Sequence, residues 1–349
     1  MLAKIGASLE YSTGISPRRW RHAQSGQTVV ILMYHRIDPA SSSQAHVPPA
    51  YGVERGVTAD VFERQIRFML KHFEPRHLTR LFSEGSRVPG FTVTFDDGYA
   101  DNLHLAAPIL SRLKVPAGIF LNSEFVGTDR RFWWETLGSL IRETDATHID
   151  ADLVGEFNPS NGESDEALPL SSASEREYAH WTISQMLMHM HDSDISAALH
   201  KIAHALSVPP RFEDRDWPLL DWDQVRQLAA SGFEVGAHGA NHANLGLSNP
   251  SQARAEVLRS VSGIEGQLQD EVQTFAYPYG GEAHRSQAAL DAVREAGCRW
   301  AFTTEPRAAT LGDAPLTLPR VGLTGPGSLT CAYRIDRAYR SIRTPQAGK

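Results

Sequence analysis

Apolar residues along the chain follow two alternating patterns. Short runs rich in β-branched and aromatic residues predict buried strands, and longer stretches with apolar residues every three or four positions predict amphipathic helices. This alternation predicts a parallel sheet, either open or closed into a barrel. The expected strands lie in TVVILMYHRI (through Met33), Phe91–Phe95, VPAGIFLN, GFEVGAHGANH, QTFAYPYGG, RWAFTTE and LTLPRVGL, and the expected helices include VFERQIRFMLKHF and DWDQVRQLAASG, the latter with Asp221 as N-cap and Gly232 as its stop.

The interval 129–218 breaks this alternation. It contains no convincing buried strand, and its segments RFWWETLGSLIRE and REYAHWTISQMLMHMHDSDISAALHKIAHAL have helical spacing. The polar segment between them, NPSNGESDEALPLSSASE, predicts a loop. We therefore expect a helical insertion within one α/β domain spanning 28–325, with an N-terminal extension (1–27) and a C-terminal tail (326–349).

Polar residues able to do chemistry follow several predicted strands directly. They are His35, Asp96, Asp97, His238 and Tyr279. The carboxyl ends of parallel strands meet at one edge, where the active sites of barrels and of open sheets lie. We expect these five residues to converge, although a strand followed by Asp-Asp-Gly is also consistent with an ordinary turn.

The segment HGANH contains two histidines four residues apart, His238 and His242. Two imidazoles and one carboxylate form a metal site that leaves positions open for water, although such a pair also occurs by coincidence. Gly239 stands where the helical zinc-protease motif requires a glutamate, so a loop is expected here. The histidines of the insertion have no strand-end carboxylate nearby and are interpreted as ordinary helix residues: His189, His191, His200 and His204.

Composition narrows the range of functions. The 349 residues carry a formal charge of -7, which provides no basic surface and argues against a nucleic-acid partner. No apolar stretch is long enough for a transmembrane segment and the N-terminus lacks a signal-peptide pattern, so we expect a soluble cytoplasmic protein. Cys298 and Cys331 could pair, but two free thiols in a reducing compartment are the better expectation.

The ordered motifs TFDDGYADN, HGANH and FAYPYG resemble those of the polysaccharide deacetylases, the NodB-homology or carbohydrate esterase family 4 group. The resemblance covers Val29–Leu323 without the insertion. It implies a distorted (β/α)7-type barrel with a helical insertion. It also implies a divalent metal ion, most commonly Zn2+ with Co2+ or Ni2+ as alternatives, and removal of N-acetyl groups from sugars.

The same resemblance implies roles for individual residues. Asp97, His238 and His242 would bind the metal ion, and Asp96 would act as general base. The backbone N–H of Tyr279 would stabilise the oxyanion of the tetrahedral intermediate.

Three positions depart from the commonest family pattern. The late L-x-H motif that supplies the general acid is absent, and TLPRVGL has Arg320 there instead. LMYHRI resembles the exopolysaccharide branch that acts on poly-N-acetylglucosamine, in which an N-terminal strand supplies the histidine, so we assign His35 as the acid. Ala276 replaces the arginine that orients the base, a role we assign to Arg320, and Gly239 replaces a common Ser or Thr.

Aromatic residues near strand ends are candidates for sugar binding. They are Tyr34, Tyr277 and Trp300, with Trp300 expected as a wall of the acetyl pocket. Aromatic faces suit the apolar face of a pyranose, although aromatic residues in a domain of this size are often simply core.

The expected function is therefore metal-dependent N-deacetylation of an N-acetylated sugar or glycan intermediate in surface or exopolysaccharide metabolism. A cytoplasmic location favours a lipid-linked or nucleotide-linked substrate. A non-catalytic carbohydrate binder with a degenerate site is the alternative. A phosphatase using an Asp nucleophile is a third interpretation, but that class needs Asp-x-Asp, and here Asp96 and Asp97 are adjacent.

Overall fold

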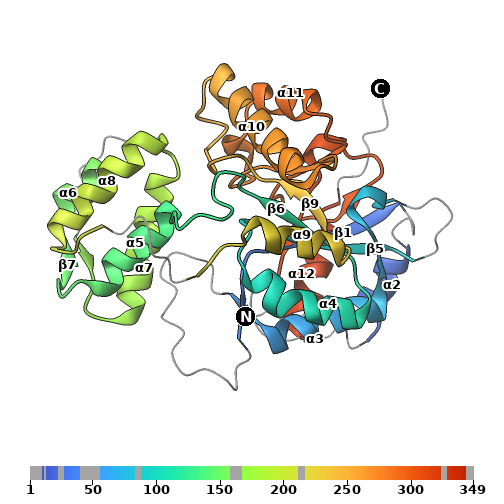
Figure 1. Ribbon diagram of the computed structural model, residues 1–349. Coiled ribbons are helices and arrows are strands. Elements are labelled where there is room, and N and C mark those ends of the chain that lie inside the picture. Colours follow the sequence, from blue (N-terminus) through green and yellow to red (C-terminus); the bar gives the residue numbers. More distant parts are fainter. Residues whose placement is uncertain are drawn as a thin grey trace, which may run out of the picture. The chain divides into compact units, whose positions relative to one another are not determined.

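The structure is a computed structural model. It describes residues 10–11, 13–22, 27–39, 56–82, 88–157, 167–210, 217–323 and 328–342. The chain divides into two compact units (Figure 1). The first contains the described parts of Met1–Gln44, Gly56–Gly127 and Leu219–Lys349, and the second contains the described part of Thr128–Pro218.

Parallel strands of the first unit form a strongly curled sheet. Its order runs β11-β10-β9-β6-β5-β1, and β13 then pairs with the far side of β1. A parallel bridge between Leu318 and Phe302 brings the chain before β13 back to β11, so the sheet curls toward closure. This confirms the predicted (β/α)7-type barrel. Its strands are β1 (Thr28–Tyr34), β5 (Gly90–Phe95), β6 (Ala117–Leu121), β9 (Glu234–Ala237), β10 (Thr274–Ala276), β11 (Trp300–Phe302) and β13 (Val321–Gly322).

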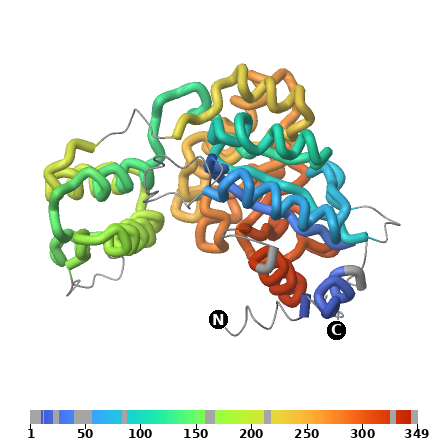
Figure 2. Tube along the Cα trace, turned by 90° about the horizontal axis from the view of Figure 1, so that it is seen from below, coloured from blue at the N-terminus to red at the C-terminus, as the bar shows by residue number. Residues whose placement is uncertain are grey.

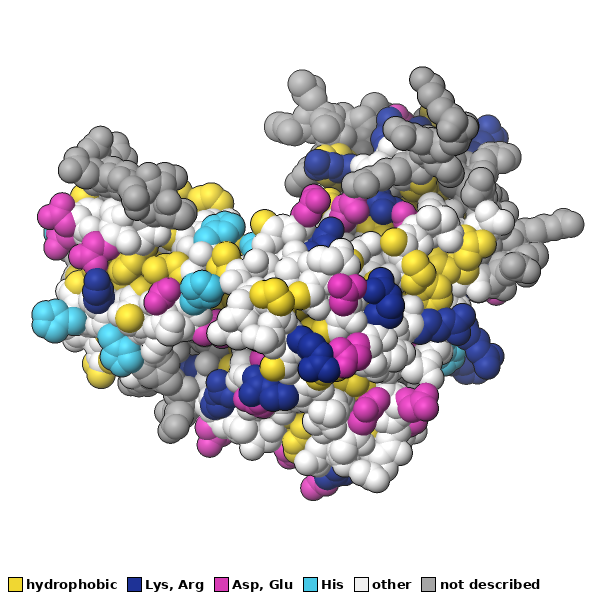
Figure 3. Space-filling model, turned by 90° about the horizontal axis from the view of Figure 1, so that it is seen from above, with side chains coloured by type: hydrophobic (Ala, Val, Ile, Leu, Met, Phe, Trp, Pro, Cys, Tyr) yellow, Lys and Arg dark blue, Asp and Glu magenta, His cyan; other side chains and the backbone are white. Residues whose placement is uncertain are grey.

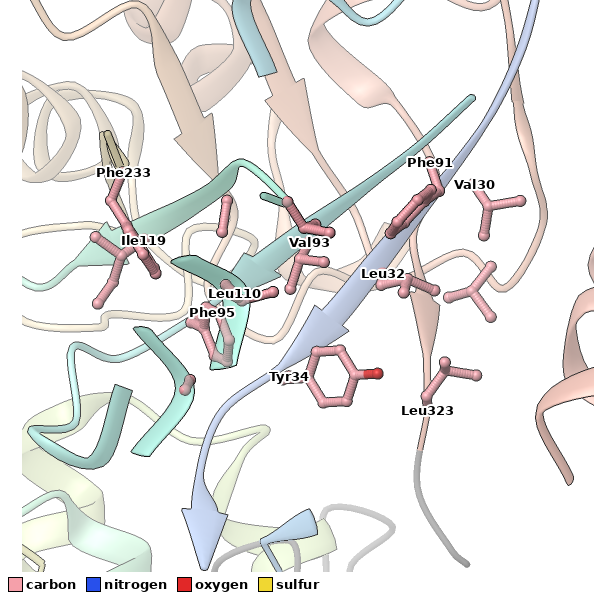
Figure 4. Packing of buried hydrophobic residues seen from close by; sticks show 14 of the residues in the cluster. Val30, Leu32, Tyr34, Phe91, Val93, Phe95, Leu110, Ile119, Phe233 and Leu323 are labelled. Carbon is pink, nitrogen blue, oxygen red and sulfur yellow. The ribbon is translucent and has the colours of Figure 1, made fainter. Parts of the chain in front are cut away.

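Side chains alternate between the two faces of this sheet, as the two-residue period of a strand requires. On the outer face Leu32, Val93 and Phe95 pack with helix residues in the main hydrophobic core (Figure 4). On the inner face a smaller cluster contains Phe120 and Phe302. Helices surround the strands (Figure 2): α3 (Ala59–His72), α4 (Ala107–Leu113), α9 (Trp222–Ala230), α10 (Pro250–Leu268), α11 (Gln287–Glu295) and α12 (Ser328–Arg340).

Local sequence signals explain where α9 begins and ends. Asp221 caps its first turn through the backbone N–H of Gln224, whose side chain returns the bond, which confirms the predicted N-cap. Gly232 follows the helix with φ +94°, which favours glycine. The remaining short elements of this unit are α2 (Ile15–His22), β2 (Ile37–Asp38), β3 (Val57–Thr58), β4 (Glu74–Pro75), β12 (Ala309–Thr310), the π-helix η3 (Asn102–Ala106), and the 3-10 turns η2 (Leu78–Arg80), η4 (Glu282–His284) and η5 (Pro315–Thr317).

Helices α2 and α12, which belong to the expected N-terminal extension and C-terminal tail, contribute to the core of the first unit. Trp20 of α2 is 1% exposed, and Cys331 and Ile335 of α12 are fully buried. Arg19 also pairs with Asp336 of α12 at 2.5 Å. The physical reason is the apolar stripe of α12, which must be covered.

Both cysteines of the chain, Cys298 and Cys331, are free and buried. Burial raises the thiol pKa of each to about 12. Since the thiolate is the reactive form, neither thiol is primed for oxidation at neutral pH.

The second unit has a hydrophobic core of its own, which includes Leu140, Ile183 and Leu199. Its helices are α5 (Trp133–Glu143), α6 (Ala151–Glu156), α7 (Ala173–Leu187) and α8 (Asp192–Ala205), and the short strands β7 (His148–Ile149) and β8 (Leu168–Pro169) pair antiparallel. The long helical pattern of the sequence is thus two helices. The expected loop contains β8, and its residues 158–166 lie outside the described part.

The surface is polar and mixed in charge. On the face shown in Figure 3, basic and acidic side chains are interspersed over the larger unit. The four histidines interpreted as ordinary helix residues are all exposed, but only His200 and His204 lie in a helix, whereas His189 and His191 lie in the connection between α7 and α8. No helix in the described ranges combines the length and apolar character needed to span a membrane.

Candidate active site

The carboxyl edge of the barrel gathers the strand-end residues. β5 leads directly into Asp96 and Asp97, and β9 leads into His238. The backbone N–H of Asp96 donates to Tyr34 O at 3.0 Å, and that of His238 donates to Leu121 O at 2.9 Å. Each residue therefore sits one position past its strand, still fixed by the sheet's hydrogen bonding.

A buried cluster of one carboxylate and two imidazoles lies at this edge. Asp97 Oδ1 is 3.5 Å from His238 Nε2 and 3.6 Å from His242 Nε2. His238 Nδ1 donates to Ala276 O at 2.8 Å, which leaves the lone pair of Nε2 on the side of Asp97. Burial lowers the pKa of His238 to about 4 and that of His242 well below its ordinary value, so both imidazoles are neutral at pH 7.

These groups fit a divalent cation. One candidate ligand atom from each residue lies within 4.8 Å of the others, and no second such His, Cys, Asp or Glu cluster occurs among the residues that the structure describes. Two nitrogen ligands and one oxygen ligand suit zinc and leave a position open. The hydrogen bond to Ala276 O provides the outer contact that orients a ligating histidine.

The backbone is strained at this cluster. Six non-glycine residues in the described ranges have positive φ, and three of them are Asp97 (71°), His242 (59°) and Tyr279 (59°). Each such conformation costs on the order of 1 kcal/mol and persists only where the surrounding structure imposes it, which is typical of functional sites. The two adjacent carboxylates have different partners, since Asp97 lies beside the two histidines and Asp96 pairs with Arg320.

Two residues outside the predicted set brace the HGANH loop. Asn122 Nδ2 donates to His238 O, and the buried carboxylate of Glu256 accepts the backbone N–H of Asn241. Gly239 has φ +79°, and a Cβ there would lie 3.3 Å from Glu256 Oε1. The Ser or Thr common in relatives therefore does not suit this loop, and the Glu256 carboxylate stabilises it instead.

Asp96 forms a bidentate ion pair with Arg320 inside the barrel. Both carboxylate oxygens accept from the guanidinium at 2.7 Å, and Arg320 Nε donates to Thr303 O at 3.1 Å. Burial alone would raise the pKa of Asp96, but the charge and the hydrogen bonds of Arg320 outweigh it and hold this pKa well below its usual range. Asp96 is therefore ionised at neutral pH.

His35 and Tyr279 complete the cluster. His35 Nε2 is 4.0 Å from Asp96 Oδ2, and its side chain remains 26% exposed. The ring of Tyr279 meets that of His242 edge-on, 4.7 Å between centroids. Gly280 follows with φ +65°, and a Cβ there would lie 2.4 Å from Thr304 Cγ2, so only glycine suits this turn.

The structure does not bring the three predicted sugar-binding aromatics to the site. Tyr34 is buried on the outer face, where its hydroxyl donates to Gln65 Oε1 at 2.9 Å (Figure 4). Tyr277 is fully buried in the same core. Trp300 pairs with Thr274 at the opposite end of β11 and packs on Phe82. These expectations are corrected, because alternation turns the two tyrosines outward and strand direction takes Trp300 to the far edge.

Comparisons with known proteins agree with this geometry. The family model described as polysaccharide deacetylase matches residues 86–301, which is more than half of the chain. YxkH of Bacillus subtilis, whose name describes it as a candidate polysaccharide deacetylase, is 25% identical to this chain over 114 residues. That match spans 33% of this chain and only 39% of YxkH.

Solved structures show the same fold. The Streptococcus pyogenes deacetylase PplD, in complex with acetate, has a TM-score of 0.51 at 16% identity, covering 85% of this chain and 92% of its own. IcaB from Ammonifex degensii has a TM-score of 0.51 at 17% identity, covering 90% of this chain and 99% of its own. At these identities the likeness concerns the fold alone.

Proposed function

This chain belongs to the polysaccharide deacetylase family, and we propose that it is a metal-dependent hydrolase that removes an N-acetyl group from an N-acetylated sugar or glycan. Family membership indicates a carbohydrate esterase or deacetylase. One observation supports the catalytic version most directly: an ionised, buried Asp96 lies directly beside a cluster of Asp97, His238 and His242 suited to a metal ion. A carbohydrate-binding protein with a degenerate site would need neither the ionised Asp96 nor the cluster of one carboxylate and two imidazoles.

Asp97, His238 and His242 would hold the ion, with Zn2+ preferred and Co2+ or Ni2+ as alternatives. When bound, such an ion polarises the acetamide carbonyl and lowers the pKa of a water molecule.

Different residues of this chain then carry out the individual proton transfers. Asp96 accepts a proton from the water that attacks the acetyl carbon, and Arg320 keeps its carboxylate ionised and oriented. The backbone N–H of Tyr279 donates to the developing oxyanion. His35 protonates the amine as the C–N bond breaks, because an amine is a poor leaving group. Acetate and a free amino sugar result.

We extend the proposal to surface or exopolysaccharide metabolism because His35 directly follows the first strand, and in the exopolysaccharide branch that this chain resembles an N-terminal strand supplies the histidine. A lipid-linked or nucleotide-linked sugar is the substrate we propose for a cytoplasmic enzyme. Acetate release from polymer, from lipid-linked and from nucleotide-linked N-acetylglucosamine, compared at equal sugar concentration, distinguishes these substrates.

The metal-loaded wild type is expected to release acetate from β-1,6-linked penta-N-acetylglucosamine, with one free amine formed per acetate. Asp96→Asn preserves the shape of the side chain but removes the base, so turnover should fall by about 10²- to 10⁴-fold. Acetate is measured enzymatically and amine by fluorogenic labelling. If a metal-loaded wild type binds the oligomer in calorimetry but releases no acetate from it or from 4-nitrophenyl acetate, the non-catalytic carbohydrate binder is the correct alternative.

His35→Ala is expected to lower acetate release from the same oligomer by about 10²- to 10⁴-fold while leaving the metal content unchanged. Hydrolysis of 4-nitrophenyl acetate should persist, because a nitrophenolate leaves without protonation. His200→Ala, at an exposed helix position of the second unit, is the matched control. Near-normal oligomer turnover in the His35 variant would remove its assignment as the acid.

A further inference from the structure

The two peptide groups that follow His35 are held by two neighbouring side chains of the TFDDGYADN motif. Asn102 Nδ2 donates to His35 O at 2.9 Å. Asp101 Oδ1 accepts the backbone N–H of Ile37 at 2.9 Å. Asn102 Nδ2 also donates to Asp101 Oδ1 at 2.8 Å, which ties the two side chains into one unit.

This arrangement begins where the regular sheet ends. Strand β1 ends at Tyr34, whose carbonyl accepts the backbone N–H of Asp96, so His35 lies one residue past the strand. The side chains of Asp101 and Asn102 take over at that point. They reach it from the start of the π-helix η3, and wide turns of this kind are frequent at functional sites.

Charge and burial make the arrangement rigid. Asn102 is fully buried, and Arg36 is 3% exposed. The guanidinium of Arg36 pairs with Asp38 at 2.7 Å and lies 3.8 Å from Asp101 Oδ2. Buried hydrogen bonds and ion pairs of this kind resist displacement, because breaking one would leave its buried donor or acceptor without that partner.

We propose that Asp101 and Asn102 are positioning residues for the general acid. They hold the 35–36 and 36–37 peptide groups directly after His35, while the sheet holds Tyr34 before it, so that the His35 ring stays beside Asp96. The proposal rests on the proposed function, in which His35 protonates the leaving amine. Catalytic groups displaced by about 1 Å lose on the order of 10²-fold in rate, so a held backbone has a large kinetic value at this position.

Asn102→Ala removes the donor to His35 O. We expect kcat for β-1,6-linked penta-N-acetylglucosamine to fall about 10- to 100-fold, with KM, metal content and 4-nitrophenyl acetate hydrolysis unchanged. In the His35→Ala background the same change should cause no further loss, because Asn102 acts through His35. Asp101→Asn retains an acceptor oxygen and should preserve more oligomer turnover than Asp101→Ala.

The control is Thr144→Val in the second unit, a buried side chain that donates to Leu206 O at 2.8 Å and should leave both activities unchanged. Hydrogen exchange of the peptide covering 34–38 should quicken in Asn102→Ala and not in the control. Equal losses on oligomer and ester, an additive loss in the His35→Ala background, or unchanged exchange would overturn the positioning role. Loss in His35→Ala with none in Asn102→Ala overturns this inference alone, whereas no loss in His35→Ala overturns the proposed acid itself.

Discussion

Arg320→Met is expected to lower the free energy of unfolding by about 3–5 kcal/mol at pH 7, because it leaves the buried Asp96 carboxylate without its partner. Arg320 is fully buried, and no other cation is paired with Asp96 within hydrogen-bond distance in the described ranges. Oligomer turnover should fall with it. Arg320→Lys keeps a charge but not the two-pronged geometry. Its free energy of unfolding and its oligomer turnover should therefore lie between those of Arg320→Met and those of the wild type. Urea unfolding in EDTA and steady-state acetate release measure the two effects.

The deficit should depend on pH with a defined sign. The pKa of Asp96 is lowered in the folded state, so its contribution to stability is present above the unfolded carboxyl pKa of about 4 and is lost as pH falls below it. In Arg320→Met the buried Asp96 carboxylate has no cation beside it and therefore takes up a proton more readily. Protonation at low pH removes the unpaired buried charge and so reduces the destabilisation of the variant. The difference from the wild type should therefore shrink between pH 7 and about pH 3.

The matched control is Arg294→Met, an arginine with 64% side-chain exposure that pairs with Asp291 at 2.7 Å. An exposed pair contributes little, so its change should stay within about 0.5 kcal/mol at both pH values. A deficit in Arg320→Met that equals the control, or that stays constant with pH, would contradict the structural role given to this ion pair.

His238→Ala is expected to abolish metal binding. The wild type, stripped with EDTA and reloaded with Zn2+, should retain about one ion per chain, as expected for a site with three protein ligands. The variant should retain almost none and lose oligomer turnover by at least about 10³-fold, because the ion supplies both carbonyl polarisation and water activation. Elemental mass spectrometry gives the stoichiometry.

Thermal unfolding offers a second measure. Zn2+ at about 100 times its Kd should stabilise the wild type by about 2.7 kcal/mol and the variant not at all. His204→Ala, at an exposed position of α8, should behave like the wild type in both assays. Absence of bound metal in the wild type after reloading with Zn2+, Co2+ and Ni2+ would instead favour the non-catalytic carbohydrate binder.

Local sequence patterns determined where the strands lie along the chain and which residues follow them. The apolar runs before Asp96 and His238 are strands in the structure because β-branched and aromatic side chains favour the extended backbone and need a covered sheet. The motifs at the strand ends indicated the metal cluster, since parallel strands bring their carboxyl ends together whatever their separation along the chain. The same two-residue alternation would also have placed Tyr34 and Tyr277 on the outer face.

Tertiary structure alone decided the contacts that hold the site in place. The comparison with the family pattern had assigned Arg320 to orient Asp96, but no periodicity links two residues 224 positions apart, and only the structure shows their two-pronged ion pair. Glu256 and Asn102 were not distinguished in the sequence, because a side chain that bonds to a distant backbone group leaves no repeating pattern. Likewise Trp300 follows an unremarkable strand pattern, and only the direction and register of β11 place it at the far edge. Which residues carry the chemistry was therefore local information, and what orients them was set by the packing of the barrel.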